Sequence, residues 1–117
     1  MALHVQMINL DCADVAAQAS FWSAALGLPV DENDGNEFMR TIGFERPDLP
    51  RMMFLAVPER KTVKNRMHLD LHADDRAAEV DRLLALGATH LRDHEEFGFR
   101  WTVLADPEGN EFCIAQG

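Results

Sequence analysis

An internal repeat constrains the fold of this 117-residue chain more than any other feature. The segment starting at Met7 reads MINLDCAD, and the segment starting at His68 reads HLDLHAD. Each is followed by a helical pattern that closes on Leu-Gly, at Gly27 and at Gly87, and the first copy has one extra residue near Asp11. A repeat of this kind indicates two similar supersecondary modules in one chain.

Both helical patterns have start and stop signals. Asp14 before the first, and Asp74 or Asp75 before the second, can accept hydrogen bonds from the free N–H groups of a first helical turn. The glycine after each pattern suits the left-handed residue that ends many helices. Strand patterns follow at residues 38–43 and 51–57 in the first half, and at residues 88–91, 99–105 and 111–115 in the second. The expected element order is β-α-β-β-β twice, an α+β fold.

Length and charge limit the function classes. The length predicts one domain, with module one at about residues 1–57, a polar linker at 58–65 and module two at about residues 66–117. The net charge of −9 argues against nucleic acid and anionic membranes as partners, and favours cationic ligands. Cys12 and Cys113 are too few and too far apart for a disulfide framework, and no apolar run approaches the ~20 residues of a membrane span. We expect a soluble, cytoplasmic protein.

Nearly the whole chain resembles the glyoxalase-like and bleomycin-resistance proteins of the vicinal oxygen chelate superfamily. The most specific part is the segment KTVKNRMHLDL at residues 61–71, supported by the DPEGN turn at residues 106–110. The resemblance implies two βαβββ modules, each an incomplete barrel, facing each other around a central cleft. It also implies a homodimer. In the metal-dependent members, four cleft positions carry His, Glu or Gln and hold one divalent metal.

Carried onto this chain, those four positions fall on Met7, Leu55, His68 and Cys113. The internal repeat agrees, because it aligns Met7 with His68 and Leu55 with Cys113. Only His68 is a good ligand for a hard divalent metal, since Met7 is a weak soft donor and Leu55 is none. We therefore expect no catalytic metal and no cofactor. Glyoxalase I chemistry and the two-His, one-carboxylate iron site of extradiol dioxygenases lose support for the same reason.

Strand alternation places His68, Asp70 and His72 on one face of the second module. A carboxylate beside an imidazole orients the ring and stabilises its charged form, so His68 with Asp70 is the candidate acid–base pair. The alternative is a purely structural hydrogen-bond network. The candidate ligand contacts are Met7, Asn9, Leu55, His72, Trp101 and Cys113.

Two of these contacts have further interpretations. Cys113 could be a nucleophile if a charged His68 lowered the pKa of its thiol, or it could simply pack as a small buried side chain. Arg100 and Trp101 are adjacent on one strand and should face opposite ways, so at most one should line the cleft. An arginine near an aromatic ring would suit a planar anionic ligand.

Two functions stay open. The first is a metal-independent enzyme that acts on a small polar or aromatic molecule, with His68 as acid or base and Asp70 as its orienting partner. The second is a protein that sequesters a drug or metabolite, as bleomycin-resistance relatives do. A metal-dependent lyase, isomerase or dioxygenase is expected less, and it would have to use His68 and Cys113 as ligands.

Overall fold

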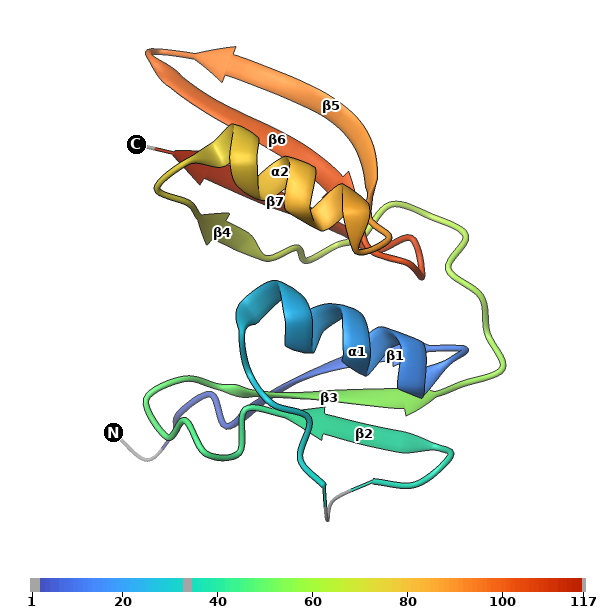
Figure 1. The fold of residues 1–117 in the computed structure, drawn as a ribbon. Coiled ribbons are helices and arrows are strands. Elements are labelled where there is room, and N and C mark those ends of the chain that lie inside the picture. Colours follow the sequence, from blue (N-terminus) through green and yellow to red (C-terminus); the bar gives the residue numbers. More distant parts are fainter. Residues whose placement is uncertain (1–2, 33–34, 117) are drawn as a thin grey trace. The chain divides into compact units, whose positions relative to one another are not determined.

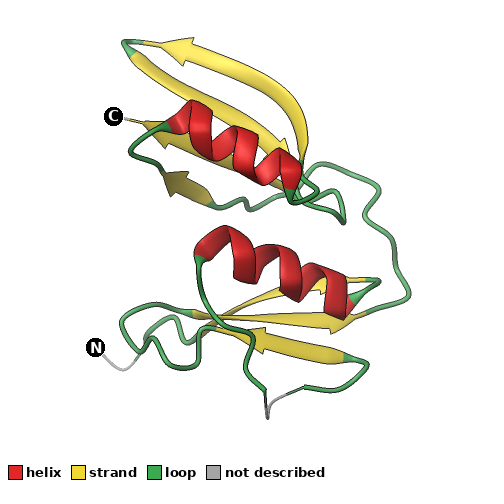
Figure 2. Ribbon diagram, viewed as in Figure 1, coloured by secondary structure: helices red, strands yellow, loops and turns green. Residues whose placement is uncertain are grey.

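The computed structural model describes residues 3–32 and 35–116, which form two compact units, Met1–Arg60 and Lys61–Gly117 (Figure 1). Each unit combines one helix with one small sheet (Figure 2). The α+β class is therefore confirmed, and within the described ranges neither sheet closes into a barrel. The boundary between the units falls inside the segment predicted as a linker. No helix in this part of the chain is long and apolar enough to cross a bilayer.

Unit 1 contains β1 (Met7–Cys12), α1 (Val15–Leu26), β2 (Met39–Ile42) and β3 (Arg51–Ala56). The sheet order is β1-β3-β2, with β1 parallel and β2 antiparallel to β3. Asp14 caps α1 as predicted, because its side chain accepts a hydrogen bond from the Ala17 N–H at 3.1 Å. The side chains buried in this unit include Phe21, Trp22, Ile42, Met52 and Phe54.

The first unit has fewer strands than the predicted module. A β-α-β-β-β order needs three strands after the helix, but the described residues form only β2 and β3 there. In place of the remaining strand, Val30 makes an isolated antiparallel bridge to Ile42. The segment at residues 31–37 is polar and rich in turn-forming residues, so it lacks the alternation that stabilises a strand.

Unit 2 has the complete predicted order. It contains β4 (Asp70–His72), α2 (Arg76–Ala85), β5 (Thr89–Glu96), β6 (Phe99–Ala105) and β7 (Glu111–Gln116). The sheet order is β4-β7-β6-β5, with β4 parallel to β7 and the other pairs antiparallel. Asp75 is the N-cap of α2, since its carboxylate accepts from the Ala78 N–H at 3.1 Å. That bond settles the choice between Asp74 and Asp75.

The second half of the predicted linker is fastened to unit 2. The Asn65 N–H donates to Glu111 Oε2 at 2.9 Å, the Glu111 N–H donates to Asn65 Oδ1 at 3.2 Å, and Lys61 Nζ lies 3.6 Å from Glu111 Oε1. Burial alone would raise the pKa of Glu111, but the Asn65 N–H and the Lys61 ammonium outweigh it and hold that pKa below its usual value. This clamp fixes the chain just before His68 against β7.

Strand β5 runs five residues further than predicted, to Glu96 instead of Leu91. Residues 92–96 are Arg-Asp-His-Glu-Glu, which lack an apolar alternation because β5 is an edge strand and mostly exposed. The β5–β6 hairpin closes through Phe97 and Gly98, with φ of 52° and 80°. Phenylalanine is not a turn former, so residues 97 and 98 do not match the dipeptides that are typical of two-residue hairpins.

We expect Phe97→Asn to raise the free energy of unfolding by about 0.5–1 kcal/mol. A two-residue hairpin with positive φ at both positions favours asparagine first, whereas a bulky side chain there is strained. The Phe97 side chain is 96% exposed, so little packing is lost. Urea unfolding of both proteins measures the change. Gly98→Ala is the opposite control and should be destabilising; a less stable Phe97→Asn variant would contradict the explanation.

Candidate functional site

The two faces of the unit 2 sheet differ. Helix α2 packs against β6 and β7, and on that face Thr102, Leu104, Phe112 and Ile114 are buried. The other face carries the alternate residues, which the strand register arranges in rows. Asp70, Cys113, Val103 and Arg92 form one row, and His72, Ala115, Trp101 and His94 form the next. We call this the open face of unit 2.

A hollow of about 470 Å³ lies on the open face. Its lining runs from His68 and Asp70 at the β4 edge, across Cys113 and Trp101, to Arg92 and other residues of β5. Every lining residue belongs to unit 2. The structure therefore brings together four predicted site residues: His68, Asp70, Trp101 and Cys113. His72 is exposed and is not among the described residues that line the hollow.

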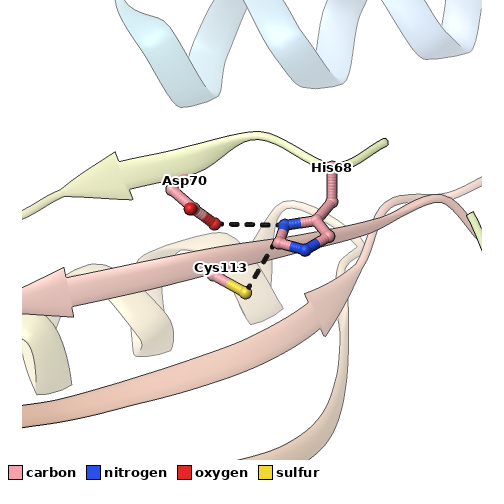
Figure 3. Close-up of side chains that lie close together, drawn as sticks. All are labelled: His68, Asp70 and Cys113. Atoms are coloured by element: carbon pink, nitrogen blue, oxygen red, sulfur yellow. Dashed lines mark hydrogen bonds and ion pairs between the residues drawn. The ribbon is translucent and has the colours of Figure 1, made fainter. Parts of the chain in front are cut away.

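His68 and Asp70 form a hydrogen-bonded pair (Figure 3). His68 Nδ1 lies 3.1 Å from Asp70 Oδ1, and the two side chains are 39% and 73% exposed. His68 precedes β4, and the Cys113 N–H donates to the Leu69 carbonyl at 2.9 Å, which ties the chain between them to β7. In the neutral ring Nδ1–H donates to Asp70. Nε2 then stays available, with no hydrogen-bond partner recorded among the described residues.

Cys113 completes a cluster of three potential donor groups. Its Sγ lies 4.0 Å from His68 Nδ1. Burial raises the pKa of the Cys113 thiol, and the negative charge of Asp70 raises it further. The thiolate is the nucleophilic form of cysteine. A raised pKa therefore argues against Cys113 as a nucleophile and favours its role as part of the wall.

We expect Asp70→Asn to accelerate alkylation of Cys113 by iodoacetamide about two- to tenfold at pH 8. Removing the carboxylate charge lowers the thiol pKa, so a larger fraction is thiolate at that pH. The rate is measured by mass spectrometry of the Cys113 peptide. Asp74→Asn is the matched control, because Asp74 is an exposed aspartate outside the hollow. Equal rates in all three proteins would contradict the electrostatic explanation.

The β5 side of the hollow carries an aromatic platform. The His94 and Trp101 rings are stacked, with centroids 5.0 Å apart and planes at 17°. Arg92 Nε donates to His94 Nε2 at 3.1 Å, which holds the His94 ring in place. Arg100 also lines the hollow together with Trp101, which corrects the expectation that only one of them would. Strand alternation fixes the direction of the Cα–Cβ bond, whereas a long arginine side chain near a strand end can reach the other face.

The sequence prediction missed Arg92 and His94. Both follow Leu91, where β5 was predicted to end, so neither was placed opposite Trp101. Extending the hairpin symmetrically back from residue 99 would have paired residue 94 with Trp101, as the structure does. The signal was weak because the extension is polar on both faces.

The predicted residues of unit 1 do not form a comparable cluster. Asn9 is exposed, and Met7 and Leu55 are partly buried. Met7 pairs with Arg51 and Leu55 with Asp11, so four positions along β3, about 13 Å of strand, separate them. The repeat alignment made Met7 and Leu55 equivalent to His68 and Cys113, but only the second pair is in proximity.

The donor set does not fit the hard divalent metal of the metal-dependent relatives. The ligand atoms of His68, Asp70 and Cys113 lie within 4.8 Å of one another, so Asp70 joins the two donors predicted from sequence. The cluster offers one imidazole and one carboxylate, fewer hard ligands than such sites use. Its third member would have to be the Cys113 thiolate, a soft ligand that suits such a hard-metal site poorly.

Comparison with known proteins agrees with this architecture. Among proteins with curated descriptions, none matches the sequence. Solved structures that resemble the chain include a glyoxalase/bleomycin resistance protein/dioxygenase family enzyme from Burkholderia phytofirmans, with 22% identity over 97% of this chain and 98% of the relative, and a TM-score of 0.78. The fosfomycin resistance protein FosX from Mesorhizobium loti has 12% identity over 100% and 93%, and a TM-score of 0.73.

A third similar structure is the bleomycin-binding protein of Streptomyces verticillus in complex with copper(II)-bleomycin, with 19% identity over 100% of this chain and 98% of the relative, and a TM-score of 0.65. At these identities the likeness shows the fold. The family model of the glyoxalase-like domain matches residues 7–115, almost the whole length. The chain therefore belongs to the glyoxalase-like domain family of the vicinal oxygen chelate superfamily.

Proposed function

We propose that the protein binds a small molecule in the hollow on the open face of unit 2, and that His68 exchanges a proton with this molecule without a metal. The observation that carries the proposal is the 3.1 Å contact between His68 Nδ1 and Asp70 Oδ1 inside that hollow. A carboxylate on one ring nitrogen fixes the tautomer and makes the other nitrogen the base. The superfamily fold, which includes a bleomycin-binding protein, supports small-molecule binding.

The proposed step uses only groups of this chain. With Nδ1–H donating to Asp70, the lone pair of His68 Nε2 takes a proton from an acidic C–H or O–H group of the ligand, and the bonding electron pair stays on the ligand. The imidazolium that forms is stabilised by the Asp70 carboxylate at 3.1 Å. Return of the proton to another atom would isomerise the ligand, and return to the same atom would exchange it with solvent.

Sequestration is the second candidate. The Asp70 side chain is 73% exposed, so water competes for its carboxylate and the orienting effect on His68 is weakened. If His68 is not a strong base, a ligand bound in the hollow would not react. The protein would then store the ligand, or lower the concentration of a toxic one. This function predicts affinity for the ligand without any proton exchange.

The test starts with the molecule that the protein carries from the cell. Small molecules released from purified protein are identified by mass spectrometry and returned to wild type, His68→Gln and His72→Gln in D2O. We expect wild type and His72→Gln to exchange a ligand proton for deuterium, and His68→Gln to be about 10²–10⁴-fold slower with similar affinity. His72 is the matched control, because it is a nearby histidine, the last residue of β4, and it does not line the hollow.

The outcomes separate the alternatives. Binding without exchange in wild type supports sequestration and contradicts the catalytic proposal. Unchanged exchange in His68→Gln contradicts the role of His68. Elemental analysis of the same sample, followed by dialysis against chelator, tests the metal-free mechanism. Stoichiometric metal whose removal abolishes exchange would contradict it.

We also propose that the protein is a cytoplasmic homodimer, as the family resemblance implies. The support is that resemblance. Light scattering at micromolar concentration should give twice the mass of one chain. The mass of a single chain would contradict the dimer.

A further inference from the structure

The charge of the hollow is opposite to that of the chain. The sequence has 20 acidic and 11 basic residues, and its net charge is −9. The lining nevertheless contains three permanent cations, Lys64, Arg92 and Arg100, against two carboxylates, Asp70 and Glu111. The expectation of a cationic ligand rested on the net charge. The lining carries the opposite balance.

Both carboxylates in the hollow are already engaged. Asp70 is hydrogen-bonded to His68 at 3.1 Å. Glu111 accepts from the Asn65 N–H at 2.9 Å and lies 3.6 Å from the Lys61 ammonium. Neither forms an ion pair with a lining cation in the part of the chain that the structure describes.

The three cations are correspondingly without anionic partners. Among the described residues, no carboxylate lies within ion-pair distance of Lys64, Arg92 or Arg100. The recorded bond of Arg92 is from Nε to His94 Nε2, which leaves both terminal nitrogens of its guanidinium available. Unpaired arginines gathered in one hollow of an acidic protein point to an anion from outside the chain.

The shape of the lining adds a second condition. The His94 and Trp101 rings are stacked at 17°, and Arg92 holds the His94 ring through its Nε–H. Phe99 also lines the hollow and is 64% exposed. A flat aromatic surface beside a planar guanidinium fork matches a flat conjugated group that carries an anion.

We propose that the hollow binds a planar carboxylate, an aromatic or conjugated acid, with its carboxylate on the terminal nitrogens of Arg92 and its flat part against Trp101. This inference rests on the proposed function in one respect, namely that the ligand occupies the same hollow. It does not require proton transfer by His68. Arg100 and Lys64 supply further positive charge around the carboxylate.

Four small probes of similar size test the ligand class: benzoate, cyclohexanecarboxylate, benzamide and benzamidine. Dissociation constants come from NMR titrations of the whole protein. We expect benzoate to bind most tightly, about tenfold better than neutral benzamide or cationic benzamidine, because a charged hydrogen bond to arginine is lost. Cyclohexanecarboxylate, which has the charge but is not flat, should bind several-fold more weakly than benzoate.

Variants test the residue assignment. Arg92→Gln should weaken benzoate binding about tenfold, and Arg92→Lys should also weaken it because lysine keeps the charge but loses the planar fork. Arg66→Gln is the matched control: it removes the same charge from an exposed arginine that does not line the hollow, and it should leave the affinity unchanged. If Arg92→Gln and Arg66→Gln lose the same benzoate affinity, the effect comes from net charge alone. That result would overturn the assignment of Arg92 as the residue that binds the carboxylate.

The remaining outcomes are distinct from a failure of the proposed function. Preference for benzamidine, equal binding of all four probes, or no benzoate binding at tens of millimolar overturns the planar-anion inference. Benzoate binding that depends on Arg92, combined with no proton exchange by the natural ligand, leaves the inference standing and removes the catalytic role of His68. If His68 exchanges a proton of a natural ligand that carries no anionic group, the proposed function stands and the planar-anion inference fails.

Discussion

Replacing Phe112 by alanine should lower the free energy of unfolding by about 3–5 kcal/mol. Phe112 is 1% exposed and lies on β7, on the face that packs against α2. The next residue along β7 is Cys113, which lines the hollow on the opposite face of the sheet. The buried Phe112 ring therefore anchors the strand that carries part of the site. Urea unfolding followed by circular dichroism measures the change.

Phe97→Ala is the matched control, because the same side chain is lost at a position that is 96% exposed. Its effect should stay within about 0.5 kcal/mol. If Phe112→Ala is too unstable to purify, Phe112→Leu keeps most of the volume and should cost about 1–2 kcal/mol. A loss below about 1 kcal/mol for Phe112→Ala would contradict the assignment of this residue to the core.

Replacing Asp106 by alanine should lower the free energy of unfolding by about 2–4 kcal/mol. Asp106 is 3% exposed, and its Oδ1 accepts from the Glu108 and Asn110 N–H groups, each at 2.9 Å. Its Oδ2 accepts from Asn110 Nδ2 at 3.1 Å, and the turn is completed by Gly109 at φ 91°. Truncation would leave these partly buried donors without an acceptor, which costs more than removing both partners of a hydrogen bond.

The control for this turn is Asp74→Ala, which removes an exposed aspartate beside the α2 cap and should change stability by less than about 0.5 kcal/mol. Thermal unfolding of the two variants gives the comparison. Equal stability of Asp106→Ala and Asp74→Ala would contradict a structural role. The expected result would mean that the DPEGN segment has a structural role in the turn. The turn determines where β7 begins and therefore the position of Cys113 along that strand.

Features with a short-range physical cause could be predicted from the sequence. Asp14 caps a helix as expected because the capping bond involves residues three apart. The complete order of unit 2 follows from its alternation and from the turn at residues 106–110. The contact between His68 and Asp70 also follows from residue spacing, and Cys113 joined them through the family resemblance.

Features that depend on pairing between distant strands could not be predicted from the sequence. The position of Leu55 relative to Met7 depends on the register of β1 on β3, which pairs Met7 with Arg51 and Leu55 with Asp11 and which the repeat alignment does not predict. Arg92 and His94 reach the site because an edge strand extends through polar residues that β6 holds in place. The local charge of the hollow depends on which cations converge there, and a net charge cannot predict that.

The central claim is that a small molecule binds on the open face of unit 2. Its most direct test is the NMR signal of the two tryptophan indoles while the co-purified molecule is titrated into the ligand-free protein. Trp101 lines the hollow, whereas Trp22 is 1% exposed in the core of unit 1. We predict that the Trp101 indole shifts in a saturable way and that the Trp22 indole does not. A saturable shift of Trp22 with an unmoved Trp101 would contradict the account.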